Sequence, residues 1–144
     1  MDSDLVQVLD GRLKGTMAEL LGMRITYADT QRVAGVFVVR PQLYQPFGVL
    51  HGGALMTFLD TLAGFAASIN VPPGRIFTTA EFKINMIRSI REGEVSGEAT
   101  PVHLGQRTQV WQASAYDPAG RTLALATLTQ LVIEPRDTGA RNAP

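Results

Sequence analysis

The most apolar stretch of the chain runs from Gly53 to Ile69 and is apolar on nearly every side. A helix at a protein surface carries one apolar stripe, whereas a helix that is apolar all round is usually enclosed by other elements. The pattern therefore predicts one long, buried helix, which ends at the turn-forming sequence of residues 71–74.

After this helix the apolar positions recur at every second residue, a spacing that is typical of half-buried strands. In the first such segment the apolar positions are Ala80, Phe82, Ile84 and Met86, and the polar positions are Thr79, Glu81, Lys83 and Asn85. Further strands are expected at about residues 93–102, 107–116 and 121–133, the last two joined by a turn at residues 117–120.

The segment before the helix is less regular. Residues 5–21 carry apolar side chains at helical spacing with two interrupting glycines, so we expect one or two short helices that end at Gly22. A pair of strands is expected at residues 23–28 and 32–39, and a loop with two prolines follows over residues 41–50.

One enclosed helix followed by an antiparallel meander predicts an α+β fold, in which a curved sheet wraps around the central helix. We expect a single domain over residues 1–134, with a helical N-terminal segment over residues 1–21, and a disordered polar tail over residues 135–144. The edge strands of such a sheet need covering, commonly by a second copy of the chain.

The composition narrows the classes of function. Thirteen basic and thirteen acidic side chains cancel, so there is no electrostatic case for a nucleic-acid or membrane partner. The absence of cysteine excludes disulfides, thiolate catalysis and cysteine-ligated zinc. The first ten residues do not form a secretory signal, and the apolar helix is interrupted by a charge, so a cytoplasmic protein is expected.

The candidate chemistry lies at the start of the apolar helix. His51, Gly52 and Gly53 precede it directly, and Asp60 is the only charged residue between Arg40 and Arg75. The N-terminus of a helix offers unpaired N–H groups that can hold an oxyanion or polarise a carbonyl. A carboxylate among apolar residues is costly to bury unless it is hydrogen-bonded or has a chemical role.

One helix cannot easily bring these two groups to the same small molecule. The eight residue steps from Gly52 to Asp60 span roughly 12 Å, whereas a base and an oxyanion donor must each lie about 3 Å from the reacting group. Two antiparallel helices related by a two-fold axis would place the N-terminus of one beside the middle of the other. We therefore expect a dimer with two equivalent, shared sites.

Four separate segments resemble the hotdog-fold acyl-CoA thioesterases, in particular the phenylacetate-pathway and 4-hydroxybenzoyl-CoA types. They are Gln45 with His51-Gly52-Gly53, Asp60 with Gly64, the segment 79–88 and the segment 101–111 with its His-Leu-Gly sequence. The resemblance covers about residues 20–134. It implies a hotdog fold, hydrolysis of an aryl- or medium-chain acyl-CoA, no metal or redox cofactor, and a dimer that pairs again into a homotetramer.

The resemblance also implies a role for each matching residue. Asp60 would be the nucleophile or the general base, and the Gly52 N–H of the partner subunit would polarise the thioester carbonyl. Gln45 would orient the carbonyl or a water molecule, His51 would support the loop, and Thr79 would lie near the attacking water. The remaining positions implied to bind substrate are Gly53, Gly64, Met86, Arg88, His103, Leu104, Gly105, Gln106, Arg107 and Thr108.

Some questions stay open at this stage. Relatives with the most similar His-Leu-Gly segment carry Glu at the position of Asp60 and His at that of Met86, which leaves direct attack and general-base catalysis as alternatives. A hydratase or dehydratase is disfavoured because His51 belongs to the His-Gly-Gly sequence, and a module that only binds acyl-CoA would not need Asp60. The candidate acyl-pocket residues are Phe47, Leu50, Met56, Phe58 and Leu59.

Overall fold

The structure is a computed structural model that describes residues 3–135. Its helices and strands are α1 (Ser3–Gly11), α2 (Met17–Leu21), β1 (Arg24–Ala28), β2 (Val33–Val38), the short 3-10 helix η1 (Pro41–Leu43), α3 (Gly52–Asn70), β3 (Ile76–Met86), β4 (Glu94–Leu104), β5 (Thr108–Tyr116) and β6 (Thr122–Ile133). Every helix and strand predicted from the sequence is present, with ends shifted by a few residues. The tail predicted at residues 135–144 lies, apart from Pro135, outside the described residues.

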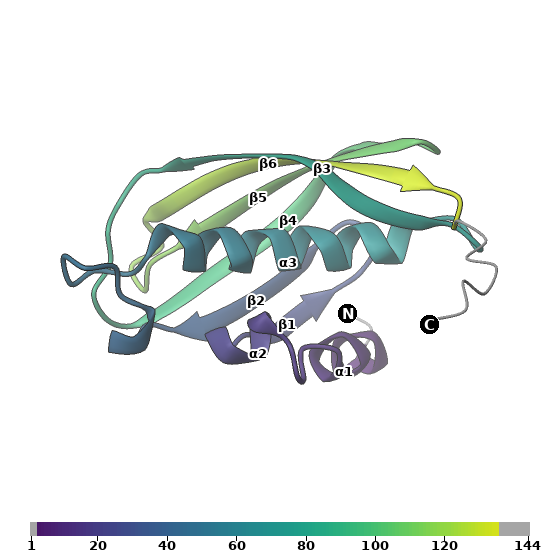
Figure 1. Cartoon of the computed structure of the whole chain (residues 1–144). Helices are drawn as coiled ribbons and strands as arrows, with labels where there is room; N and C mark the ends of the chain where they lie inside the picture. The colour runs from purple at the N-terminus through teal and green to yellow at the C-terminus, as the bar shows by residue number, and fades with distance from the viewer. Residues whose placement is uncertain (1–2, 136–144) are drawn as a thin grey trace, which may run out of the picture.

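The six strands form one antiparallel sheet in the order β1-β2-β4-β5-β6-β3. Figure 1 shows the sheet curving behind α3, with α1 and α2 beside α3 at the β1 end. This arrangement confirms the predicted curved sheet around one central helix. It leaves β1 and the eleven-residue β3 as the two edges of the sheet.

The face of α3 that meets the sheet supplies the core. Its buried residues are Leu55, Phe58, Leu59, Leu62, Ala63, Ala66 and Ala67. The Phe58 ring packs edge-on against Phe37, with ring centroids 5.0 Å apart. The same ring also lies against Gly97 on β4, where an added Cβ would be only 2.4 Å from Phe58 Cε1. Gly97 is therefore required by the close approach of helix and sheet.

By length and composition α3 is apolar enough to cross a membrane, and it is the one helix within residues 3–135 of which this is true. In the fold one face of α3 packs against β2, β3, β4, β5 and β6, whereas Met56 and Asp60 on its other face are exposed. The prediction of a helix buried on every side is therefore wrong for the single chain. A buried core helix satisfies the same length and composition criteria.

A β-bulge in β3 changes one prediction from the sequence. Thr79 pairs with Gln130 of β6, but the next pair is Glu81 with Thr129, so Ala80 is an extra residue. In a regular strand Thr79 and Phe82, three residues apart, would face opposite sides of the sheet. The bulge shifts the alternation, so that both face α3. The sequence pattern, which assumed strict alternation, wrongly placed Thr79 on the polar face with Glu81. Bulges of this kind re-aim a side chain.

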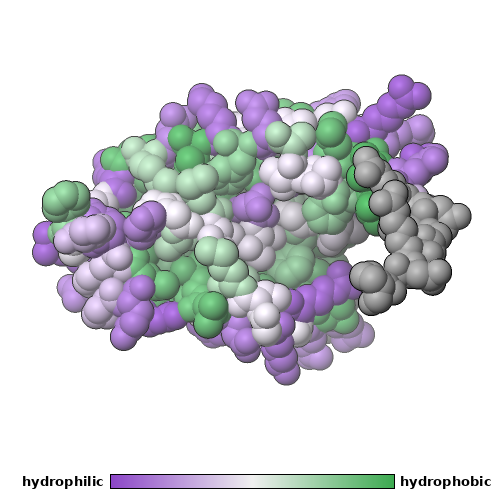
Figure 2. Space-filling view, viewed as in Figure 1, coloured by the Kyte–Doolittle hydropathy of each residue, from purple (hydrophilic) through white to green (hydrophobic). Residues whose placement is uncertain are grey.

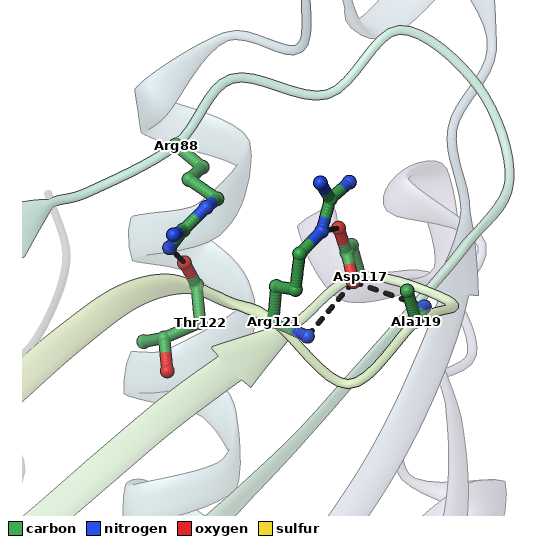
Figure 3. Close-up of polar contacts among 5 residues, drawn as sticks. All are labelled: Arg88, Asp117, Ala119, Arg121 and Thr122. Carbon is green, nitrogen blue, oxygen red and sulfur yellow. Dashed lines mark hydrogen bonds and ion pairs between the residues drawn. The ribbon is translucent and has the colours of Figure 1, made fainter.

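Asp117, which is buried, holds the predicted turn between β5 and β6 through the hydrogen bonds shown in Figure 3. Its carboxylate accepts hydrogen bonds from the Arg121 and Ala119 backbone N–H groups at 2.9 and 3.0 Å, and from Arg121 Nε at 2.7 Å. The pKa of Asp117 is held below its usual range, chiefly by the hydrogen bond from the Arg121 backbone N–H and also by the Arg121 side chain.

Replacement of Asp117 by asparagine is expected to lower the free energy of unfolding at neutral pH. Because the folded-state pKa of Asp117 is depressed, its contribution is fully present above the unfolded value of about 3.9 and is lost as pH falls through the folded value. Urea titrations of both proteins between pH 7 and pH 3 should therefore converge at low pH. A stability difference that is constant over that range would contradict this role.

Candidate active site

His51 begins α3 as its N-cap. Its backbone is extended, with φ −67° and ψ 132°, and its Nδ1 accepts a hydrogen bond of 2.8 Å from the Gly53 N–H. Nδ1 must be unprotonated to accept this bond, so the ring proton is on Nε2. The structure therefore gives His51 a supporting position at the start of the helix. Whether it also touches a substrate stays a prediction.

Gly52 is the first residue of α3, and within residues 3–135 no acceptor is found for its N–H. A Cβ added to Gly52 would be 3.0 Å from Cε of Met86, so the Met86 side chain lies directly on this glycine. Both residues line a cavity of about 280 Å³ whose walls are Gln45, Leu50, Gly52, Leu55, Met86, Ile87, Arg88 and Ser89. We call it the polar cavity.

Gln45 is fixed in the polar cavity by its own loop. Its backbone N–H donates to Val49 O at 2.8 Å, its carbonyl accepts from the Gly48 N–H at 3.0 Å, and its side-chain Oε1 accepts from the Phe47 N–H. With Oε1 used in this way, the Nε2 group is the part of the side chain available as a donor. Gln45, Gly52, Met86 and Arg88, which the sequence placed in one site, thus come together.

Asp60 lies on the exposed side of α3, because the helix turns Leu59, Leu62 and Ala63 toward the sheet. The expectation of a carboxylate surrounded by apolar residues is therefore wrong for the single chain. Thr79 Oγ1 donates a hydrogen bond of 3.1 Å to Asp60 Oδ1. The bulge in β3 thus joins the two residues that the family resemblance assigned to the attack on a thioester.

The site residues of one chain do not form a single site. Asp60 borders a cavity of about 370 Å³ beside α1 and α2, which is lined by Arg12, Leu13, Thr16, Met17, Ala18, Thr57, Asp60, Thr61 and Phe65. Gly52 lines the polar cavity instead. The geometry of one chain therefore keeps the proposed oxyanion donor and the carboxylate apart, as the helix rise of roughly 12 Å over eight steps requires.

The predicted segment from His103 to Thr108 lies still farther along the molecule. It forms the turn between β4 and β5, next to Gln109, whose Nε2 donates to the carbonyl of Asn70 at the C-terminal end of α3. A Cβ added at Gly105 would be 2.6 Å from His103 Nε2, so that glycine is needed for the histidine to fold over the turn. Leu104, Gln106 and Arg107 are exposed.

Two further residues of the predicted site, Arg88 and Gly64, lie near α3 or on it. Arg88 is exposed, lies at the N-terminal end of α3, and donates from Nη1 to the Thr122 carbonyl at 3.3 Å (Figure 3). Gly64 follows Asp60 by one turn on α3, where an added Cβ would make only ordinary contact with Phe77. One chain therefore separates Arg88 from the His103–Thr108 turn by most of the length of α3, which is about 28 Å.

Two of the five acyl-pocket residues suggested from the sequence belong to the core instead. Phe58 and Leu59 are fully buried in the core and Leu50 is nearly so, whereas Phe47 is 85% exposed. Met56 and Phe47 are exposed and Leu50 lines the polar cavity, so these three keep positions at which a ligand could touch them. Periodicity identified these side chains as apolar but could not tell core positions from pocket positions.

An apolar cavity of about 400 Å³ was not anticipated from the sequence. It lies between α2, η1 and the first turns of α3, and its walls are Met17, Leu20, Leu21, Gln42, Leu43, Tyr44, His51, Gly53, Ala54 and Thr57. Figure 2 shows apolar surface over the region of α2. This α2 cavity and the polar cavity flank the N-terminus of α3, lined by Gly53 and by Gly52 respectively.

Within residues 3–135 no three histidine, cysteine, aspartate or glutamate side chains are close enough to hold a metal ion. The prediction that the reaction uses no cofactor is not tested by this observation.

Residues 47–124 match the family model of the Thioesterase superfamily. The proofreading thioesterase EntH of Cronobacter sakazakii is 30% identical over 128 residues, which cover 89% of this chain and 93% of the relative. The 1,4-dihydroxy-2-naphthoyl-CoA hydrolase of Escherichia coli is 30% identical over 128 residues, or 89% of this chain and 94% of the relative.

Solved structures give the same result. A crystal structure of a thioesterase from Haemophilus influenzae superimposes with a TM-score of 0.86, at 27% sequence identity, and covers 94% of each chain. A thioesterase from Pseudomonas aeruginosa superimposes with a TM-score of 0.85 at 29% identity, covering 89% of this chain and 93% of that one.

Proposed function

Because this chain belongs to the thioesterase superfamily, has the hotdog fold and is a thioester hydrolase, we propose that it hydrolyses an acyl-CoA to the free acid and coenzyme A. One relative is named for the hydrolysis of a CoA thioester, which supports this choice of leaving group. The aryl or medium-chain nature of the acyl group is part of the proposal.

The hydrogen bond between Thr79 and Asp60 is the observation that carries the proposal. It fixes one oxygen of an exposed carboxylate on a helix that has no other charged residue. A carboxylate held in this way, but still open to a ligand, is suited to attack a thioester or to activate water. The hydroxyls of Thr57, Thr61 and Ser68 on α3 each donate to a carbonyl of the helix, so Asp60 is its one carboxylate base.

The site is completed by a second copy of the chain. Strand β3 is a long, exposed edge beside α3, and antiparallel pairing of two such edges would set two α3 helices side by side in opposite directions. The N-terminus of one helix would then face the middle of the other. This arrangement would bring Gly52 of the partner subunit toward Asp60, and the partner's His103–Thr108 turn toward Arg88.

The chemistry follows from these positions. The Asp60 carboxylate either attacks the thioester carbonyl carbon directly or removes a proton from a water molecule that attacks it. When water attacks, the C–S bond breaks and the acid forms directly, whereas direct attack leaves the acyl group on Asp60 as a mixed anhydride that a water molecule then hydrolyses. In both routes coenzyme A takes up a proton and leaves as the thiol. Negative charge that develops on the carbonyl oxygen would be stabilised by the Gly52 N–H, and Gln45 Nε2 would help orient the same oxygen.

Arginine is well suited to bind the phosphates of coenzyme A through paired hydrogen bonds. Arg88 borders the polar cavity and is exposed, so we assign it to the CoA side of the site, with Arg107 from the other subunit. A dimer of such dimers remains our expectation for the assembly, and sedimentation velocity would measure it.

Replacement of Thr79 by valine is expected to lower kcat about tenfold with little change in KM, because it removes a hydrogen bond to a charged group without changing the side-chain shape. Steady-state kinetics of thiol release would measure the effect. Thr78→Val is the matched control, since Thr78 lies next to Thr79 and is also exposed but has no hydrogen bond to Asp60. Equal effects of the two substitutions would remove Thr79 from the site.

The proposal is tested by thiol release from a panel of aryl- and alkyl-CoA thioesters. Hydrolysis of at least one member at a rate well above the uncatalysed reaction is expected. Binding of CoA esters without release of thiol from any of them would favour a module that only binds acyl-CoA. Hydration of an enoyl-CoA in place of thiol release would favour the hydratase alternative.

A further inference from the structure

The two cavities at the N-terminus of α3 differ in chemistry. The polar cavity contains Gln45, Arg88 and Ser89, whereas the α2 cavity is walled mainly by Met17, Leu20 and other aliphatic side chains. A thioester held at the Gly52 N–H would have one cavity on each side. The charged and polar coenzyme A arm fits the first, which leaves the second for the acyl group.

From this division we infer that the α2 cavity is the acyl-binding subsite and that it takes a linear, saturated acyl chain of medium length. The inference rests on the proposed function, whose substrate class it names. A cavity of about 400 Å³ is within the usual range for small-molecule sites. Nothing in the sequence pattern had assigned α2 to a site.

Several polar groups in the walls of this cavity are already hydrogen-bonded within the chain. Thr57 Oγ1 already donates to the Gly53 carbonyl at 3.0 Å, and His51 Nδ1 already accepts from the Gly53 N–H. The Tyr44 hydroxyl donates to the Arg91 carbonyl. These bonds engage the hydroxyl protons of Thr57 and Tyr44 and the Nδ1 lone pair of His51, so aliphatic side chains make up most of the free surface that a ligand would meet. Such a surface suits an aliphatic chain.

The rim of the α2 cavity includes two exposed apolar side chains of the short helix α2. Met17 is 68% exposed and Leu20 is 75% exposed, and both belong to the five-residue helix α2. A bound aliphatic chain would cover part of this surface. Since α2 lies at the β1 end of the sheet (Figure 1), pairing of two chains through β3 at the opposite edge would leave the cavity open.

The test compares binding of S-octyl-CoA and S-ethyl-CoA, two thioethers that have no carbonyl and cannot be hydrolysed. Each buried methylene group strengthens binding about fourfold, so burial of half of the six additional methylenes gives about 60-fold tighter binding of S-octyl-CoA. Isothermal titration of the full-length protein measures both dissociation constants. Equal affinities would overturn the subsite.

Leu20→Glu places a charge at the rim and is expected to remove at least tenfold of the preference for S-octyl-CoA, while the affinity for S-ethyl-CoA changes less than twofold. Val8→Glu is the matched control, because Val8 is 52% exposed on the neighbouring helix α1 and lines none of the cavities described above. A Leu20→Glu protein that keeps the full preference would show that the chain binds elsewhere.

Ala54→Leu provides a second variant that fills the cavity from α3 with a good helix former. It should lower kcat/KM for octanoyl-CoA at least tenfold and leave butyryl-CoA within twofold. Higher kcat/KM for benzoyl-CoA than for octanoyl-CoA in the wild-type protein would overturn the proposed chain class. Tight binding of S-octyl-CoA by a protein that hydrolyses no acyl-CoA would support the subsite but refute the proposed function.

Discussion

Replacement of Asp60 by asparagine is expected to lower kcat for acyl-CoA hydrolysis by about three orders of magnitude. Asparagine has the same shape as aspartate and can still accept the hydrogen bond from Thr79. It cannot attack a carbonyl as an anion or remove a proton from water. Because Asp60 is exposed, the melting temperature should hardly change, so the loss can be assigned to chemistry. Thiol release under single-turnover conditions measures it.

Asp60→Glu is the companion variant for this experiment. It keeps the carboxylate but extends it by one methylene group, which displaces the reacting oxygen by about 1 Å and is expected to cost about 10²-fold. A protein with Asp60→Asn that retains more than a tenth of the wild-type kcat would show that another group carries out the attack.

Gly52→Pro is expected to lower kcat by about 10²–10³-fold through loss of a single backbone N–H. Proline suits the first position of a helix, because its fixed φ is helical and the missing N–H has no partner within the helix. The residue before a proline must be extended, and His51 already is, with ψ 132°. The variant should therefore fold, with α3 intact, and lack only the proposed oxyanion donor.

Gly52→Ala separates the loss of the N–H from steric effects. Its Cβ would meet only the flexible end of the Met86 side chain, at 3.0 Å, so a small shift of that side chain accommodates it. We expect Gly52→Ala to retain most of the activity that Gly52→Pro loses. Equal losses in the two variants would indicate a packing effect at Met86 rather than an oxyanion donor.

The elements were predictable because each had its own local signal. The apolar stretch that became α3, the alternation in the strands after it and the turn at Asp117 all depend on residues close in sequence. The αL conformation of Gly22 at the end of α2 follows from the same local rules. The N-cap position of His51 does not, since histidine is not among the residue types that favour an N-cap.

Features that depend on distant residues were not predictable in this way. The bulge that turns Thr79 toward Asp60 is set by the register with β6, which no local pattern encodes. Two glutamines, Gln109 and Gln130, are buried under α3 although both belong to a polar residue type. Gln109 bonds to Trp111 and Asn70, whereas the side-chain amide of Gln130 has no partner among residues 3–135.

Several candidate site residues predicted from the sequence come together in the structure. Gln45, Gly52, Met86 and Arg88 meet in one cavity, and Asp60 meets Thr79. Two of the residues suggested for the acyl pocket, Phe58 and Leu59, instead fill the core. The separation of Gly52 from Asp60 along α3 follows from helix geometry alone, which is why the sequence already predicts a site shared with a second chain.

A site shared between two subunits is tested most directly by mixing two inactive variants. Asp60→Asn and Gly52→Pro proteins, unfolded together and refolded at equal concentration, should form mixed dimers in about half of the population, each with one intact site. The recovered activity is then expected to be about a quarter of that of the wild type. Activity no greater than the sum of the two separate variants would contradict the shared site, since each site would then draw both groups from one chain.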